Sequence, residues 1–158
     1  MQKRSVEISP EQLDRQRRAM ERVRRLSQER PQPPLAFVDT YGCQQNEADS
    51  EQIRGMLVDM GYTLTDSKAD ADVIVVNTCA VREHAENRVL GIIGALVHTK
   101  KAKPSQIICV CGCMAQQKRV AETLRRSYRH VDMAFGPQAL WRFPELLEKV
   151  LTERTRLF

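Results

Sequence analysis

The sequence lacks the features that define several large classes of protein. No run of apolar residues approaches the roughly 18 that a membrane-spanning helix needs. The N-terminus, MQKRSVE, lacks the apolar core of a secretory signal. Aromatic residues make up only 5% of the chain, and histidines number 3. These absences argue against a membrane or secreted protein, so we expect a cytoplasmic location and no membrane partner.

A phosphate-binding loop is missing as well. The first predicted strand runs into YGCQQN (41–46), which has neither the GxGxxG spacing of a dinucleotide site nor a run of Ser and Thr that could hold a phosphate. A non-enzymatic flavodoxin-like module that binds a nucleotide or flavin is therefore an alternative that no motif supports.

The remaining composition is that of an ordinary globular domain. The chain has 158 residues, of which 42% are hydrophobic and 28% charged, which is enough for one domain with a real core. The net charge of +5 is compatible with an RNA or DNA partner. Many proteins without such a partner are equally basic, so the charge alone does not decide the function.

The N-terminal segment predicts a basic helix over 8–30. Ser9 suits the N-cap position and Pro10 the first helical position. Apolar residues are few and arginines outnumber the acidic residues, so we expect an exposed surface helix or arm, with an RNA-contacting helix as the alternative. PQPP (31–34) ends the helix. We therefore divide the chain into an N-terminal helix with a proline-rich linker over 1–34 and a main domain over 35–158.

Strand-like and helix-like segments alternate through the main domain. This alternation predicts an open, mostly parallel, doubly wound α/β sheet of the flavodoxin-like or Rossmann-like type, with helices on both faces. The continuously apolar run VIVV (73–76) is typical of a strand covered on both faces. The predicted strands cover 35–40, 62–65, 72–77, 106–111 and 131–135, and the predicted helices cover 46–60, 81–99, 115–128 and 138–151.

Three of the five cysteines follow the ends of predicted strands: Cys43, Cys79 and Cys113. Ligands of open α/β sheets bind beyond the carboxyl ends of the strands, and a helix N-terminus nearby favours the thiolate. We therefore predict that these three side chains converge on one metal or iron–sulfur site. An all-thiolate triad suits a [4Fe–4S] cluster with one iron left open, and a zinc-binding module is the alternative.

The other polar and sulfur-containing candidates have weaker roles. Cys109 and Cys111 lie inside a predicted strand, so we expect them to pack in the core. Asn46 is expected to cap the helix that follows Cys43 or to point into the site. Asn77 and Thr78 precede the second cysteine and could donate hydrogen bonds to cluster sulfurs, although turn and capping roles are open for them too.

Three ordered segments resemble a known family. TYGCQQNEADSE (40–51), VNTCAVREHAEN (76–87) and VCGCMAQ (110–116) are similar to the N-terminal domain of the methylthiotransferases, and the resemblance covers roughly 35–151. These are radical S-adenosylmethionine enzymes that insert a methylthio group into tRNA or a ribosomal protein. The resemblance implies an auxiliary [4Fe–4S] cluster held by Cys43, Cys79 and Cys113, whose open iron accepts the sulfur or methylthio group.

Within the family, VREHAEN (81–87) and CGCMAQ (111–116) resemble the members that act at C2 of N(6)-isopentenyladenosine (dimethylallyladenosine) beside the tRNA anticodon. Members that act on threonylcarbamoyl-adenosine or on a ribosomal protein remain alternatives. The resemblance implies tRNA and a sulfur donor as partners of a cytoplasmic enzyme, and we expect the chain to be a monomer.

One departure from the family pattern limits these implications. The catalytic domain of the family carries a CxxxCxxC motif, which ligates a second [4Fe–4S] cluster that cleaves S-adenosylmethionine. This sequence contains no such spacing, and it ends at Phe158, where that domain would begin. The resemblance therefore implies a fragment that holds the auxiliary cluster. We expect it to lack the catalytic residues of the radical step, the radical domain that would be its partner, and the C-terminal RNA-binding domain.

Overall fold

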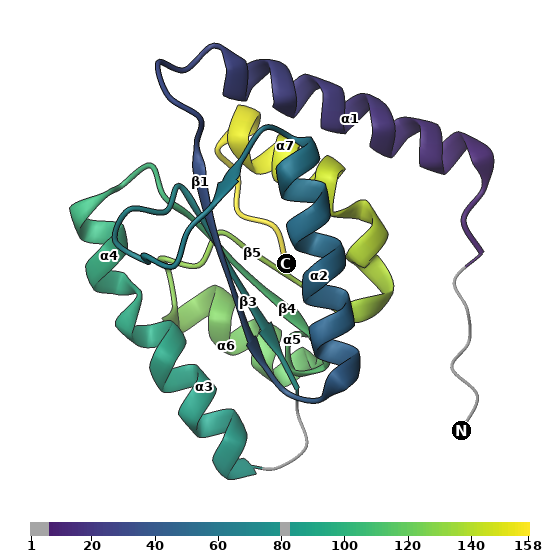
Figure 1. Cartoon of the computed structure of the whole chain (residues 1–158). Helices are drawn as coiled ribbons and strands as arrows, with labels where there is room; N and C mark the ends of the chain where they lie inside the picture. Colours follow the sequence, from purple (N-terminus) through teal and green to yellow (C-terminus); the bar gives the residue numbers. More distant parts are fainter. Residues whose placement is uncertain (1–6, 80–82) are drawn as a thin grey trace.

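A parallel sheet organises the main domain. The computed structural model describes residues 7–79 and 83–158, and within them five strands form one sheet in the order β2-β1-β3-β4-β5. All neighbouring strands pair in parallel, and helices cover both faces (Figure 1). The predicted doubly wound α/β fold is therefore confirmed. The strands are β1 (Leu35–Tyr41), β2 (Thr63–Leu64), β3 (Val73–Thr78), β4 (Ile107–Gly112) and β5 (Met133–Phe135).

The strand order fixes where a ligand can bind. β3 and β4 are buried along their whole length, as their apolar sequences require, whereas β2 is a two-residue edge strand with exposed side chains. The chain winds outward in one direction from β1 and in the other from β3. The ligand crevice of this topology lies beyond the carboxyl ends of these two strands.

Three of the predicted helices are divided. The structure has two helices each where single ones were predicted over 81–99, 115–128 and 138–151, and residues 81 and 82 lie outside the described residues. Extended backbone at Gln117 interrupts the second, and Pro144 stands in the first turn of the last helix, where it cannot donate a helical hydrogen bond. The helices are α1 (Pro10–Gln28), α2 (Gln44–Asp59), α3 (Glu83–Ala95), α4 (Val97–Ala102), α5 (Cys113–Gln116), α6 (Lys118–Ser127), η1 (Pro137–Arg142) and α7 (Phe143–Glu153).

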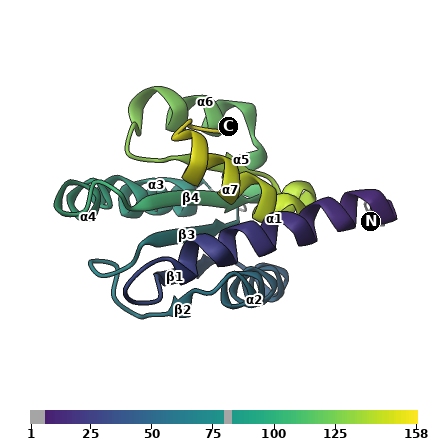
Figure 2. The same cartoon turned by 90° about the horizontal axis from the view of Figure 1, so that it is seen from above.

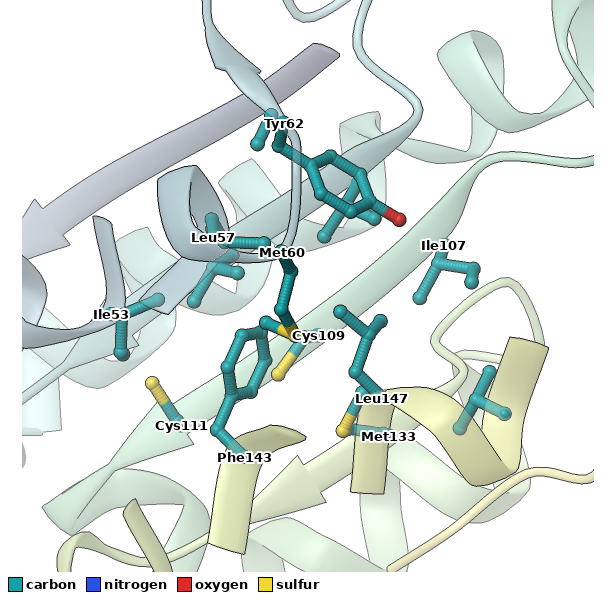
Figure 3. Packing of buried hydrophobic residues seen from close by; sticks show 14 of the residues in the cluster. Ile53, Leu57, Met60, Tyr62, Ile107, Cys109, Cys111, Met133, Phe143 and Leu147 are labelled. Atoms are coloured by element: carbon teal, nitrogen blue, oxygen red, sulfur yellow. The ribbon is translucent and has the colours of Figure 1, made fainter. Parts of the chain in front are cut away.

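Two apolar clusters lie on the two faces of the sheet. α2 and α7 pack on one face, and α3, α5 and α6 pack on the other. Figure 3 shows Cys109 and Cys111 in the first cluster, beside Phe143 and Leu147. Their side chains are 0% and 2% exposed. The prediction that these two cysteines belong to the core is therefore confirmed.

Helix α1 packs against α7 on the outside of this cluster (Figure 2). Ala19 and Val23 are fully buried, and the Gln16 side chain bonds to Glu145 in the first turn of α7, at 3.0 Å to its carboxylate and 3.1 Å to its amide. The helix is therefore attached to the main domain through one face, while most of its arginines are exposed. No helix in the described part of the chain is both long and apolar enough to cross a membrane.

Candidate functional site

The carboxyl ends of β1, β3 and β4 open into one cavity. The register pairs Tyr41 with Thr78 and Thr78 with Gly112, so the loops that follow these strands start side by side. A cavity of about 490 Å³ lies there, and Cys43, Cys79 and Cys113 all line it. The structure thus brings together the three cysteines that the sequence singled out.

Cys43 stands at the N-terminus of α2. It is the N-cap residue, in extended conformation, so the helix begins at Gln44 and not at the predicted residue 46. Asn46 is the third helical residue, and its Oδ1 accepts the Cys43 N–H at 3.2 Å. Asn46 thus takes part in capping α2, as expected, but it does so from the third helical position as the reciprocal half of a capping box.

The surroundings of the three thiols differ. Backbone N–H groups of Asn46 and Gln45 at the start of α2 hold the pKa of the exposed Cys43 thiol below its usual range. Burial raises the pKa of the Cys79 thiol, and the neighbouring Cys43 and Cys113 raise it further, since like charges would then lie close together. Cys113, the first residue of α5, is exposed.

Two glycines allow the cysteine-bearing loops to approach one another. A Cβ atom at Gly42 would lie 2.6 Å from the Cys79 Cβ and would also overlap Asn46 Oδ1. Gly112 has a φ of 99°, and a Cβ atom there would overlap the Thr78 carbonyl and lie 2.8 Å from the Thr78 nitrogen. Both positions require glycine for the observed packing, and Gly112 requires it for its backbone conformation as well.

Buried polar side chains fasten the loops from below. Asn77 Nδ2 donates to the Asn46 carbonyl at 2.8 Å and to Ser50 Oγ at 3.0 Å, and Thr78 Oγ1 donates to the Cys111 carbonyl at 2.7 Å. The side-chain donors of Asn77 and Thr78 are therefore engaged within the protein, which matches the structural role that the sequence left open for them. Each is buried in a parallel strand, where a polar group must be satisfied by its neighbours.

Ser50 is a further member of this buried polar network. This residue is fully buried, and its hydroxyl also lies 2.7 Å from Thr40 Oγ1. Ser50 follows Asn46 by one helical turn and precedes the apolar Ile53 and Leu57 on the buried face of α2. The 3.6-residue period of the helix could have placed it inward.

The donors at this cavity are three thiols, which is the ligand type of a [4Fe–4S] cluster. Among the side chains that the structure describes, those of residues 7–79 and 86–158, no group of three or more His, Cys, Asp or Glu is placed to hold a metal ion. A zinc ion bound at about 2.3 Å by three thiolates would require their sulfurs within about 4 Å of one another. A [4Fe–4S] cluster sets a wider spacing, because its three cysteines bond to three different irons. Three thiols around an open cavity match that chemistry.

The fold and the site together define a parallel α/β domain with three cysteines around a cavity at the carboxyl end of its sheet. Residues 35–136 match the model described as "Uncharacterized protein family UPF0004". Because this match covers more than half of the sequence, the chain belongs to that family.

Relatives with an assigned activity share this domain. The chain is 41% identical over 157 residues to the tRNA-2-methylthio-N(6)-dimethylallyladenosine synthase of Acetivibrio thermocellus, a match that covers 97% of this chain and 33% of that protein. Proteins of the same name from Alkaliphilus oremlandii and Halalkalibacterium halodurans are 47% and 50% identical, over 91% and 73% of this chain and 30% and 21% of their own lengths. The family resemblance is thus confirmed, and the chain spans at most about a third of the length of these relatives.

Proposed function

We propose that this chain is the auxiliary-cluster domain of a tRNA methylthiotransferase that adds a methylthio group at C2 of N(6)-isopentenyladenosine beside the anticodon. The observation that carries the proposal is the convergence of three cysteine thiols, each at the end of a different strand, on one cavity. The names of the relatives support the choice of tRNA and of the dimethylallyl (isopentenyl) adenosine as substrate.

In this proposal Cys43, Cys79 and Cys113 each bind one iron of a [4Fe–4S] cluster. The bound cluster supplies an iron with a free coordination position, at which a sulfur ligand can be held. The chain contributes the thiolates and the opening. Backbone N–H groups at the start of α2 stabilise the Cys43 thiolate, and the cavity leaves room beside the cysteines for the sulfur to be transferred.

The radical step is proposed to lie in another part of the protein. The five cysteines contain no CxxxCxxC spacing, and the relatives are about three times as long as this chain. We therefore expect the 158-residue chain to hold the auxiliary cluster without methylthiolating tRNA by itself. We propose that the whole protein also uses a second cluster and S-adenosylmethionine, and that its partners are tRNA and a sulfur donor. We propose a cytoplasmic location and a monomeric chain.

Anaerobic reconstitution of the 158-residue chain with ferrous iron and sulfide tests this proposal. We expect about four irons and four sulfides per chain, with the absorption and electron paramagnetic resonance spectra of a [4Fe–4S] cluster. Replacing Cys43, Cys79 or Cys113 by Ala should abolish cluster formation, whereas Cys109→Ala and Cys111→Ala should leave it intact.

Three results would contradict the proposal. Stoichiometric zinc in protein prepared without air, with no iron uptake, would make the chain a zinc-binding module. Tight binding of a flavin to the metal-free chain would make it a flavodoxin-like module. Loss of the cluster on replacing Cys109 or Cys111 would show that the ligand assignment is wrong.

A further inference from the structure

Asn46 is the residue that joins the loop of Cys43 to the end of β3. It is only 4% exposed, although it lies in the first turn of α2 beside the cavity. Its Oδ1 accepts the Cys43 N–H at 3.2 Å and the Cys43 thiol at 3.3 Å. One side of the Asn46 amide is thus bound to the first cysteine.

The other side of the same amide reaches the strand that leads to the second cysteine. Asn46 Nδ2 donates to Asn77 Oδ1 at 3.2 Å and to the Thr78 carbonyl at 3.0 Å, and Thr78 directly precedes Cys79. The Asn46 carbonyl accepts Asn77 Nδ2 at 2.8 Å, which doubles the connection. A buried amide that uses both its donor and its acceptor groups holds its neighbours in one arrangement.

We propose that Asn46 is a positioning residue that fixes the Cys43 loop against the end of β3, so that the thiols of Cys43 and Cys79 are paired before any cofactor binds. Cys113 stands outside this connection, since none of the hydrogen bonds of Asn46 reaches α5. The proposal rests on the proposed function only in assigning the paired thiols to a cluster.

Ser50 offers a matched control. It is fully buried in the same polar network and bonds to Asn77 and Thr40, but it contacts neither cysteine loop through its hydroxyl. Ser50→Ala therefore removes buried hydrogen bonds without cutting the connection. Asn46→Ala removes the connection completely. Asn46→Asp keeps the size and the acceptor for the Cys43 N–H but loses the donor to Thr78, so it is the second test variant if the alanine variant does not fold.

The test uses phenylarsine oxide, a trivalent arsenical that bonds to two adjacent thiols with release of one water, on the cluster-free 158-residue chain under anaerobic conditions. The Cys113→Ala background limits the reaction to Cys43 and Cys79, because the other two cysteines are buried. We expect one arsenical per chain, with affinity lowered about 10-fold or more by Asn46→Ala and Asn46→Asp and less than about 2-fold by Ser50→Ala.

Iron loading provides the second readout, in the background that retains Cys113. The two Asn46 variants should take up less iron and lose it faster to a chelator than Ser50→Ala, at a similar thermal stability. Equal arsenical affinity in all variants, or an equal loss in the Asn46 and Ser50 variants, would overturn the inference. If the parent chain pairs its thiols but takes up no cluster, the proposed function fails and the positioning role stands.

Discussion

The two ends of the sheet are built for opposite purposes. At the amino end, where the strands begin, charged side chains bond to the backbone of neighbouring strands. At the carboxyl end, thiols surround an open cavity, and two glycines bring the loops together. The comparison teaches that charged side chains fasten the amino end, whereas buried neutral side chains fasten the carboxyl end from below and leave the thiols around the cavity free to hold a ligand.

Two aspartates close the amino end. Asp72 accepts the Leu35 N–H at 2.7 Å and pairs with Arg30 and Lys103 at 3.0 and 2.9 Å. Asp132, just before β5, plays the same part towards β4. It accepts the Ile108 N–H at 2.8 Å and pairs with Lys100 at 2.7 Å. Each carboxylate therefore links the start of one strand to the start of its neighbour.

The largest effect is expected at the carboxyl end, from Gly112→Ala. An alanine would be strained at the positive φ of this position, and its Cβ would overlap the Thr78 carbonyl. We therefore expect a loss of about 3 kcal/mol in the free energy of unfolding. Urea denaturation measures it. Gly55→Ala, in the exposed middle of α2 with nothing near the new Cβ, should instead stabilise by up to about 1 kcal/mol. Equal effects of the two substitutions would contradict the close packing of the loops.

Asp72→Asn should cost about 2 kcal/mol and leave cluster loading unchanged, because the change lies at the amino end. Burial opposes ionisation of Asp72, but the Leu35 N–H, Lys103 and Arg30 outweigh it and lower the pKa of this carboxyl. The ionised group therefore stabilises the fold at neutral pH. This contribution should disappear as the pH falls below about 4, through the folded-state pKa.

Unfolding curves between neutral and acid pH check this sign. The difference in stability between the parent chain and Asp72→Asn should shrink as the pH falls. A difference that stayed constant would contradict the stabilising role of the ionised Asp72. A loss of iron uptake in this variant would show that the two ends are not independent.

Arg156 tests a third region, which lies beyond the family match over 35–136. Its guanidinium donates to the carbonyls of Val131, Arg125 and Tyr128 at 2.8, 2.9 and 3.1 Å, closing the C-terminus of α6. Arg156→Gln should therefore cost about 1–2 kcal/mol in thermal or urea unfolding. The exposed Arg129 is the control, and Arg129→Gln should change stability by less than about 0.5 kcal/mol. Similar losses in both variants would speak against the cap.

The smallest stability effect separates the two kinds of cysteine. Cys109→Ala removes a fully buried sulfur from the core and should cost about 1 kcal/mol while the cluster still forms. Cys113→Ala changes an exposed residue and should leave stability within about 0.5 kcal/mol while the cluster is lost. Calorimetry measures the stability of the two variants, and iron analysis measures their cluster content. Cluster loss in Cys109→Ala, with a cluster retained in Cys113→Ala, would contradict the distinction between core and cavity.

The sequence was sufficient for the parts of the structure that depend on regular periods. Continuous apolar runs and their spacing predicted the parallel sheet, and the position of each cysteine on its strand separated Cys109 and Cys111 from the three at strand ends. These features were predictable because burial selects apolar residues at regular spacings along the sequence.

The sequence was insufficient where the structure depends on contacts between distant segments. The packing of α1 on α7 includes hydrogen bonds between Gln16 and Glu145, a pairing that no local pattern indicates. For Asn77 and Thr78 the sequence left two roles open, and in the structure their side-chain donors bond to Asn46, Ser50 and a carbonyl of β4. A polar residue next to a cysteine has several possible partners, and only the fold selects among them.

The central claim is that three thiols at one end of the sheet hold a cluster with one open iron. Mössbauer spectroscopy of the 158-residue chain reconstituted with ⁵⁷Fe, before and after addition of methanethiolate, tests it most directly. The account predicts that about one quarter of the iron signal changes, because one iron of the four lacks a protein ligand. An unchanged spectrum, or iron that forms no [4Fe–4S] cluster at all, would contradict it.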